Sequence, residues 1–188
     1  AWDEIKRTFE KINQDNIKII TFLDKKYPHN LLAVDDRPAF VYALGELHED
    51  DINLAIVGSR IASTYGKYTT ERISRDLAQK GITIVSGMAR GVDSAAHRGA
   101  LAARGRTIAV LGSGLDIVYP PENQSLFNQI IENGAVVSEF PPGTPPLANN
   151  FPTRNRIISG MSYGVVVVEA GEKSGSLERS MIELAEHF

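Results

Sequence analysis

The sequence has no cysteine and few aromatic residues, which make up 7% of the chain. Without cysteine there is no disulfide framework and no thiolate metal site, and we expect a protein of the reducing cytoplasm. No apolar run approaches the ~20 residues that span a bilayer, so no membrane association is expected. Neither sign of charge predominates, since the chain has 20 Lys and Arg and 23 Asp and Glu. The net charge of −3 argues against indiscriminate binding of polyanions by the whole surface and leaves local basic patches open.

The length of 188 residues suits one domain with a buried core. A share of 43% apolar and 23% charged residues is typical of a soluble globular protein. The chain begins Ala1-Trp2, with neither an initiator Met nor a basic and apolar leader. This start suggests a cut or processed chain and not a secretory precursor.

From residue 52 onward, short runs rich in β-branched residues alternate with longer segments whose apolar residues recur every three or four positions. The short runs predict strands at residues 52–57, 82–85, 107–111, 135–138 and 165–169. The longer segments predict helices at residues 65–80, 92–104, 122–133, 154–161 and 177–188. Strands that alternate with helices in this way predict an α/β fold with a doubly wound, mostly parallel sheet.

The first 50 residues follow a different pattern. They predict a short amphipathic helix at residues 2–13 and strands at residues 17–22 and 40–44, with the turn-rich segment YPHNLLAVDDRP between the strands. We therefore expect residues 1–50 to form a small N-terminal extension packed on the edge of the sheet. Residues 51–188 then form the main domain.

Five prolines gather in the segment FPPGTPPLANNFP, residues 140–152, between a predicted strand and a predicted helix. Proline restricts its own backbone and that of the preceding residue, so this segment is expected to be an extended loop. A long ordered loop at the end of a strand in an α/β fold is often functional. We refer to this segment as the Pro loop.

Glycine-containing loops follow four of the predicted strands and read IVGSR, VSGMARGVDSAAH, LGSGLDIVYPPEN and EAGEKSGSL. In open α/β sheets, ligands bind beyond the carboxyl ends of the strands, where helix N-termini offer free N–H groups. Glycine lets a ligand approach the backbone closely, and serine hydroxyls add donors. One such loop is explained as a strand-to-helix turn, but four at one edge predict a phosphate-bearing ligand. The expected contacts are Gly58, Ser59, Gly87, Gly91, Ser174, Gly175 and Ser176.

The loop sequences do not match the pattern of a dinucleotide-binding site. The first loop reads GSRIAS and lacks the Gly-x-Gly-x-x-Gly pattern, and the second strand ends in Ser86-Gly87 where an acidic residue would hold a ribose. A Walker lysine loop is absent as well. NAD-linked chemistry and NTP hydrolysis are therefore poor fits, and no cofactor is expected.

Four arginines belong to segments that reach the same edge of the sheet, namely Arg60, Arg90, Arg154 and Arg156. Guanidinium groups pair bidentately with phosphate, and a helix N-terminus adds its own attraction for an anion. We expect Arg60 and at least one of Arg154 and Arg156 to contact phosphate, and we leave Arg90 open. The alternative for each is an ion pair with an acid such as Asp93 or Glu139. Phe151 suits stacking on an unpaired base, or alternatively anchors the Pro loop in the core.

Catalytic constellations are scarce. The four histidines have no metal-ligand spacing, so no metal site is expected. His97 follows Asp93 by one helical turn, which suits a general-acid pair, but an Asp near a helix N-terminus more often caps the helix or holds a loop. The segment GSGLD departs from the Gly-x-Ser-x-Gly nucleophile elbow.

Six segments occur in a familiar order: GSR, SGMARGVDSAAHRGAL, VLGSGLDIVYPPEN, SEFPPGTPP, FPTRNRIISGMS and VVVVEAGEKSGSL. Together they resemble the DNA-processing protein A (DprA/Smf) family over about residues 28–177. The resemblance implies a Rossmann-like domain that is not an enzyme. It also implies binding of single-stranded DNA, its protection in natural transformation, and help in loading a RecA-type recombinase, by a homodimer.

The resemblance assigns DNA contacts as well. They would be Arg60 of the first loop, Phe151, Arg154, Asn155 and Arg156 after the Pro loop, and Ser174, Gly175 and Ser176. The loop at residues 87–93 would shape the floor of the pocket.

Two departures from the family pattern stand out. The family often has a basic residue just before the Phe-Pro of the Pro loop, where this sequence reads LANN at residues 147–150. One phosphate contact is therefore missing, and a lower affinity is expected. After Leu177 the family continues with a Thr-Ala helix and a further strand, but here Glu178-Arg179-Ser180 follows and the chain stops at Phe188. This end suggests truncation at the C-terminus.

The second departure from the family pattern leaves one alternative function open. The segment SGSLE, which ends at Glu178, faintly resembles the glycosidic site of LOG-like nucleotide phosphoribohydrolases. The Pro-Gly-Gly loop of those enzymes is absent, since the corresponding residues read EAGE. A nucleotide-binding sensor or hydrolase is thus the alternative function, while a scaffold acting only through protein contacts leaves the convergent loops unexplained.

Overall fold

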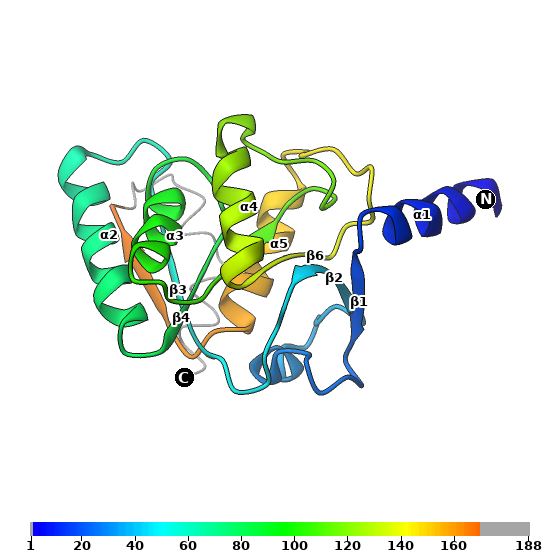
Figure 1. Cartoon of the computed structure of the whole chain (residues 1–188), viewed down its shortest axis with the longest axis horizontal. Coiled ribbons are helices and arrows are strands. Elements are labelled where there is room, and N and C mark those ends of the chain that lie inside the picture. The colour runs from blue at the N-terminus through cyan, green and yellow to red at the C-terminus, as the bar shows by residue number, and fades with distance from the viewer. Residues whose placement is uncertain (1, 170–188) are drawn as a thin grey trace.

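The protein is described by a computed structural model over residues 2–169 (Figure 1). Within them one sheet contains seven strands: β1 (Lys18–Thr21), β2 (Phe40–Gly45), β3 (Ile52–Gly58), β4 (Ile82–Ser86), β5 (Thr107–Leu111), β6 (Ala135–Ser138) and β7 (Val165–Val168). Their order is β1-β2-β6-β5-β4-β3-β7. The strands from β6 to β7 in this order run parallel, and β2 is antiparallel to both of its neighbours, β1 and β6. The predicted α/β fold with a doubly wound, mostly parallel sheet is confirmed.

Helices cover both faces of the sheet. They are α1 (Trp2–Gln14), α2 (Thr64–Ala78), α3 (Val92–Ala102), α4 (Gln124–Asn133) and α5 (Asn150–Gly160), with the short 3-10 helices η1 (His29–Ala33) and η2 (Pro121–Asn123). Helices α2, α3 and α4 lie on one face, while α5 and η1 lie on the other (Figure 1). Because strand side chains alternate, Ala55 and Val57 pack toward α5, and Ile56 packs toward α2 and α3.

The order in which strands are added to the sheet reverses between β3 and β7. From β3 the strands β4, β5 and β6 add to one side, and the chain then crosses the opposite face through α5 to place β7 on the other side of β3. Ligands of doubly wound folds bind outside the carboxyl ends of the strands at such a point. The glycine loops after β3, β4 and β5 meet at this edge, while the loop after β7 lies outside the described residues from residue 170 on.

Helix α5 begins four residues earlier than the predicted start at residue 154. The prediction treated Pro152 as part of an extended loop, but proline is tolerated in the first turn of a helix, where its missing N–H would have no partner anyway. The helix therefore starts at Asn150. Arg154 and Arg156 consequently lie beyond the first turn and do not open the helix.

The N-terminal segment adds to the same sheet. Strand β2 pairs with β6, and β1 pairs with β2. Helix α1 extends away from the body of the protein (Figure 1), and its Ile12 packs against the core. The division between residues 1–50 and 51–188 stays a prediction, and the helix predicted at residues 177–188 lies outside the described residues. Within residues 2–169, no helix has both the length and the apolar character to cross a membrane.

Candidate nucleic-acid interface

Glycines allow the first two loops of the carboxyl edge to pack together. Gly91 has a φ of +76°, and a Cβ there would lie 2.2 Å from the carbonyl oxygen of Ser59. The same oxygen accepts a hydrogen bond of 3.1 Å from the backbone N–H of Val92. Behind this contact, a Cβ on Gly58 would lie 1.9 Å from the carbonyl oxygen of Val168. The three predicted residues Gly58, Ser59 and Gly91 thus fix the position of the loop that carries Arg60.

Arg60 and Phe151 meet at the centre of this edge. The Cζ atom of Arg60 lies 5.3 Å from the ring centroid of Phe151, a cation–π geometry. Arg60 is exposed, and within residues 2–169 its guanidinium forms no ion pair. The Phe151 ring is half-buried because it packs on Gly112, whose added Cβ would lie 3.0 Å from Cδ1 of the ring. Phe151 therefore both anchors the chain and exposes part of its aromatic surface.

Tyr119 is an aromatic neighbour that the sequence analysis did not select. Its ring centroid lies 6.0 Å from that of Phe151 at an interplanar angle of 42°, and the residue is 42% exposed. The signal was present in the segment YPPEN, because an aromatic residue there closely follows a glycine loop at the same edge. The two rings together form an exposed aromatic surface beside Arg60.

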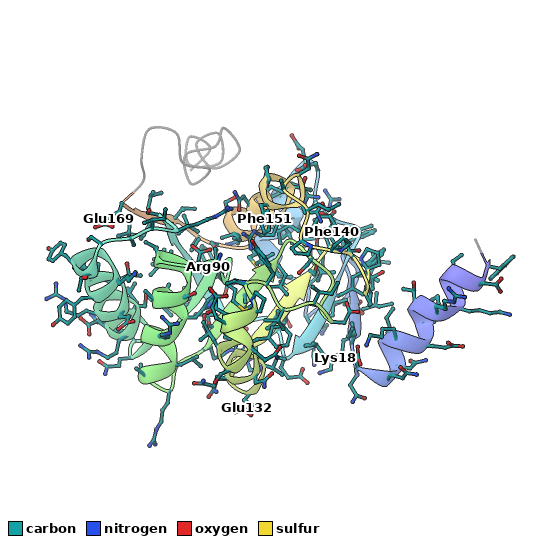
Figure 2. The ribbon with its side chains drawn as sticks, turned by 90° about the horizontal axis from the view of Figure 1, so that it is seen from above. Lys18, Arg90, Glu132, Phe140, Phe151 and Glu169 are labelled. Atoms are coloured by element: carbon teal, nitrogen blue, oxygen red, sulfur yellow. The ribbon has the colours of Figure 1, made fainter. Side chains whose placement is uncertain are left out.

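Arg90 lies at this edge too and is already paired. Its Nε and Nη2 atoms donate to the two carboxylate oxygens of Glu122 at 2.5 and 3.1 Å. These hydrogen bonds lower the pKa of Glu122 and raise the pKa of Arg90, but both side chains remain about half exposed. Seen from above in Figure 2, Glu169, Arg90, Phe151 and Phe140 follow one another across the edge. A phosphate at Arg90 would have to compete with Glu122.

Arg154 lies beneath the loops and is only 3% exposed. Its Nη1 donates to the carbonyl oxygens of Gly87, at 2.8 Å, and of Val110. Burial lowers the pKa of Arg154 to about 10, opposed by the nearby carboxylate of Asp93. A Cβ on Gly87 would lie 2.6 Å from Nη1, so the glycine makes room for the guanidinium. Arg154 shapes the floor of the site from within and does not present its guanidinium to solvent.

Arg156 is paired on two sides. Its Nη2 donates to the carboxylate oxygens of Glu139 at 2.6 and 2.7 Å, and its Nε lies 3.0 Å from Oδ2 of Asp36. Arg156 thus ties α5 to the end of β6 and to the segment before β2. The neighbouring Asn155 is half-buried and accepts a hydrogen bond from Nε of Arg154 at 3.2 Å. Ser174, Gly175 and Ser176 lie outside the described residues, as does Glu178.

Asp93 and His97 do not form a catalytic pair. Asp93 accepts a hydrogen bond from the backbone N–H of Ala89 at 3.3 Å, so it holds the loop before α3. His97 is fully buried, and its Nδ1 lies 2.7 Å from Oγ1 of Thr107. Burial lowers the pKa of His97 to about 3. Both residues therefore have structural roles beneath the site.

Glu169 occupies the N-terminus of α2. Its carboxylate accepts hydrogen bonds from the backbone N–H of Ser63, at 2.8 Å, and from the Ser63 hydroxyl, which together lower its pKa. The Ser63 hydroxyl also accepts from the N–H of Gly66 at 2.9 Å. The N-terminus of α2 is thus paired with a carboxylate of the protein itself, and the exposed Lys67 also lowers the pKa of that carboxylate.

Proteins of known family match most of this chain in sequence. The sequence model of the family described as DNA recombination-mediator protein A matches residues 18–187. Protein Smf of Escherichia coli K12 is 48% identical over 168 residues, which cover 88% of this chain and 45% of that protein. DNA processing protein DprA of Streptococcus pneumoniae is 43% identical over 167 residues, which cover 87% of this chain and 59% of that protein. The chain thus spans about half the length of the curated relatives it matches.

Two solved structures are similar as well. DNA processing protein A from Streptococcus pneumoniae superposes with a TM-score of 0.86 at 37% identity, covering 100% of this chain and 64% of that one. The protein from Helicobacter pylori, solved for its single-stranded DNA binding mode, gives a TM-score of 0.80 at 31% identity and covers 92% of this chain and 78% of that one. With these matches over nearly its whole length, the chain belongs to the DNA recombination-mediator protein A (DprA/Smf) family.

Proposed function

We propose that this protein binds single-stranded DNA at the carboxyl edge of the sheet and has no enzymatic activity. The observation that carries the proposal is the exposed guanidinium of Arg60, without an ion pair in residues 2–169, 5.3 Å from the ring of Phe151. A cation beside an aromatic ring suits a phosphate followed by an unpaired base. The single-stranded DNA binding of the Helicobacter pylori relative supports the same reading.

The residues of the site divide into contacts and supports. Arg60 binds a phosphate, Phe151 and Tyr119 offer ring surface to the bases, and Arg90 adds a second phosphate contact when Glu122 releases it. Arg154, Asn155 and Arg156 hold the floor and wall through the hydrogen bonds and ion pairs described above. Gly58, Ser59, Gly87 and Gly91 position these groups. Ser174, Gly175 and Ser176 stay predicted contacts.

Such a site distinguishes single-stranded from double-stranded DNA and does not distinguish one base sequence from another. Contacts to phosphate and to ring faces carry no base code, since every base has a π-face. A duplex hides its base faces, so Phe151 and Tyr119 have nothing to stack on. Bound in this way along its length, a single strand would be protected from nucleases and presented to a RecA-type recombinase by a homodimer of this chain.

The proposal is tested by titrating labelled oligo-dT and a duplex of the same length in a fluorescence anisotropy assay at several salt concentrations. We expect tighter binding of the single strand and a log–log salt slope of about −0.7 for each phosphate neutralised. Equal affinity for both forms contradicts the proposal. Incubation with nucleoside monophosphates provides the control for the rival activity, because release of free base detected by chromatography would favour a phosphoribohydrolase.

A further inference from the structure

Helix α2 exposes an aromatic surface that its packing does not use. Ile61, in the turn before the helix, is 95% exposed, Tyr65 is 76% exposed and Tyr68 is 63% exposed. The fully buried residues of the helix are small, namely Gly66, Thr70, Ser74 and Ala78, and the partly buried Ile73 and Leu77 pack beside them. This buried side packs against α3, so the tyrosines project from the opposite face. Neighbouring exposed apolar groups of this size mark an interaction surface more often than isolated ones do.

The exposed residues follow one line along the helix. Within α2, Tyr65, Tyr68 and Arg72 are spaced three and four residues apart, which places their side chains on the same face. Ile61 lies in the turn before them. Tyr65 and Tyr68 are separated by about 4.5 Å along the helix axis, given a rise of ~1.5 Å per residue. We call the exposed residues Ile61, Tyr65, Tyr68 and Arg72 the α2 stripe.

The charge of the α2 stripe favours an anionic partner. Arg72 is exposed, and no carboxylate within residues 2–169 forms an ion pair with it. Lys67, on the side of the same helix, is also exposed and contributes to the lowered pKa of Glu169. Two tyrosines followed by an arginine combine ring faces with a cation, as in surfaces that track single-stranded nucleic acid.

The α2 stripe also continues the proposed DNA site. It begins at Ile61, the residue directly after Arg60, and the N–H of Ile61 is held by the hydroxyl of Ser59 at 3.1 Å. Helix α2 starts at the carboxyl edge of the sheet and runs down the outer end of the helix layer (Figure 1). A strand that leaves Phe151 past Arg60 therefore meets Tyr65 next and Tyr68 one turn later.

We propose that the α2 stripe is the exit path of single-stranded DNA from the Arg60–Phe151 site, with bases stacked on Tyr65 and Tyr68 and a phosphate at Arg72. This inference rests on the proposed function and adds to it a defined length and direction of the bound strand. We expect a short oligonucleotide to occupy the Arg60–Phe151 site alone and only a longer one to reach the α2 stripe.

The test compares oligo-dT of about 5 and about 15 nucleotides, which lie near the two ends of the ~4–16 nucleotides that one single-strand-binding OB fold covers. The double variant Tyr65→Ser with Tyr68→Ser is expected to bind the short oligonucleotide like the wild type and the long one about tenfold more weakly or worse. The variant Tyr65→Phe with Tyr68→Phe keeps both rings and should retain wild-type binding of both lengths. Arg72→Gln should lower the salt slope for the long oligonucleotide alone, by about 0.7.

Tyr163→Ser is the matched control, because Tyr163 is 61% exposed but lies beside the amino end of β3, where its N–H donates to the carbonyl oxygen of Asn53. It should leave both affinities unchanged. If the wild type binds neither oligonucleotide, the proposed function fails and the path fails with it. If the wild type binds both and the double serine variant matches it at each length, the path alone is overturned. A variant that changes the sedimentation coefficient but not DNA binding would assign the α2 stripe to a second copy of the chain, which also overturns the path.

Discussion

The guanidinium of Arg60 lies over the ring of Phe151 from the solvent side of the site, with Cζ 5.3 Å from the ring centroid. A second arginine, Arg154, approaches the same ring to 5.8 Å but is buried beneath the loops. Phe151 is thus shared by an exposed cation, which is free to meet a phosphate, and by a buried cation, whose hydrogen bonds go to backbone carbonyls. The two arginines therefore differ in what their removal should do.

Substitution of Arg60 should affect both the affinity for single-stranded DNA and its dependence on salt. We expect Arg60→Ala to weaken binding by ~1–3 kcal/mol, since charge-assisted hydrogen bonds are lost. The log–log salt slope should fall by about 0.7, because one phosphate is no longer neutralised. Phe151→Ala should weaken binding by a similar ~1–3 kcal/mol but leave the slope unchanged. Anisotropy titrations at four salt concentrations measure both quantities. Unchanged binding in both variants would mean that the site lies elsewhere.

Substitution of Arg154 should instead destabilise the fold. Arg154→Met leaves the carboxylate of Asp93 buried without its neighbouring cation and frees the carbonyl oxygens of Gly87 and Val110. Leaving a buried polar group without its partner costs ~1–3 kcal/mol, so with two carbonyl oxygens affected we expect the free energy of unfolding to fall by about 3 kcal/mol. Urea denaturation measures it, and Arg98→Met, at an exposed position on α3, is the control that should change little. A stable Arg154→Met protein with a reduced salt slope would show that Arg154 binds phosphate directly.

The strands and most helix positions could be predicted from the sequence because their signals are local. Runs such as TIAVL are buried on both faces of a parallel sheet and contain β-branched and apolar residues, so β5 occupies the predicted residues 107–111. The start of α5 was misplaced because a proline is compatible both with an extended loop and with a first helical turn. Only the surrounding fold decides between them.

The chemical roles of the arginines could not be read from the sequence. Arg60 and Arg154 both reach the ring of Phe151, but one is exposed and the other is 3% exposed. Which side of α5 faces the sheet depends on the helix start and on long-range packing with Gly87, 67 residues away along the chain. The contact between Tyr119 and Phe151 is long-range as well, so the sequence offered an aromatic residue near a glycine loop but no partner for it.

Removal of the Glu122 carboxylate should strengthen DNA binding. Glu122 holds Arg90 through two hydrogen bonds, at 2.5 and 3.1 Å, so the DNA phosphate must compete with it. Glu122→Gln weakens that competition, and we expect higher affinity for oligo-dT together with a salt slope steeper by about 0.7. Glu132→Gln removes another exposed carboxylate, on α4, and should not change the slope (Figure 2). Equal slopes in all three proteins would place Arg90 outside the site.

Substitution at Gly91 should lower stability and DNA affinity more than substitution at another glycine with positive φ. Both Gly91 and Gly81 have positive φ, +76° and +82°, but a Cβ on Gly91 would meet the carbonyl oxygen of Ser59 at 2.2 Å, whereas a Cβ on Gly81 would have no neighbour within 4 Å. Gly81→Ala should therefore cost only backbone strain, ~1–2 kcal/mol of unfolding free energy, with normal DNA affinity. Gly91→Ala should cost more and also weaken DNA binding, because the loop with Arg60 must move. Urea denaturation and anisotropy provide both comparisons, and equal effects of the two substitutions would contradict the packing described for these loops.

The buried His97 should make stability depend on pH. Its pKa is lowered by burial to about 3, while in the unfolded chain it is ~6.5, so below pH 6.5 the unfolded chain binds a proton that the folded protein does not. The contribution of His97 to stability is complete above pH 6.5 and is lost by ~1.4 kcal/mol per pH unit as the pH falls toward 3. In urea denaturation at pH 6.5 and 5.0, wild-type protein should lose about 2 kcal/mol more than His97→Gln, which cannot titrate. Other groups titrate alike in both proteins. The difference between the two proteins in how the free energy of unfolding changes with pH therefore isolates His97, even if the variant is less stable at neutral pH. His48→Gln, at an exposed position, should follow the wild type, and parallel losses in wild type and His97→Gln would refute a neutral buried imidazole.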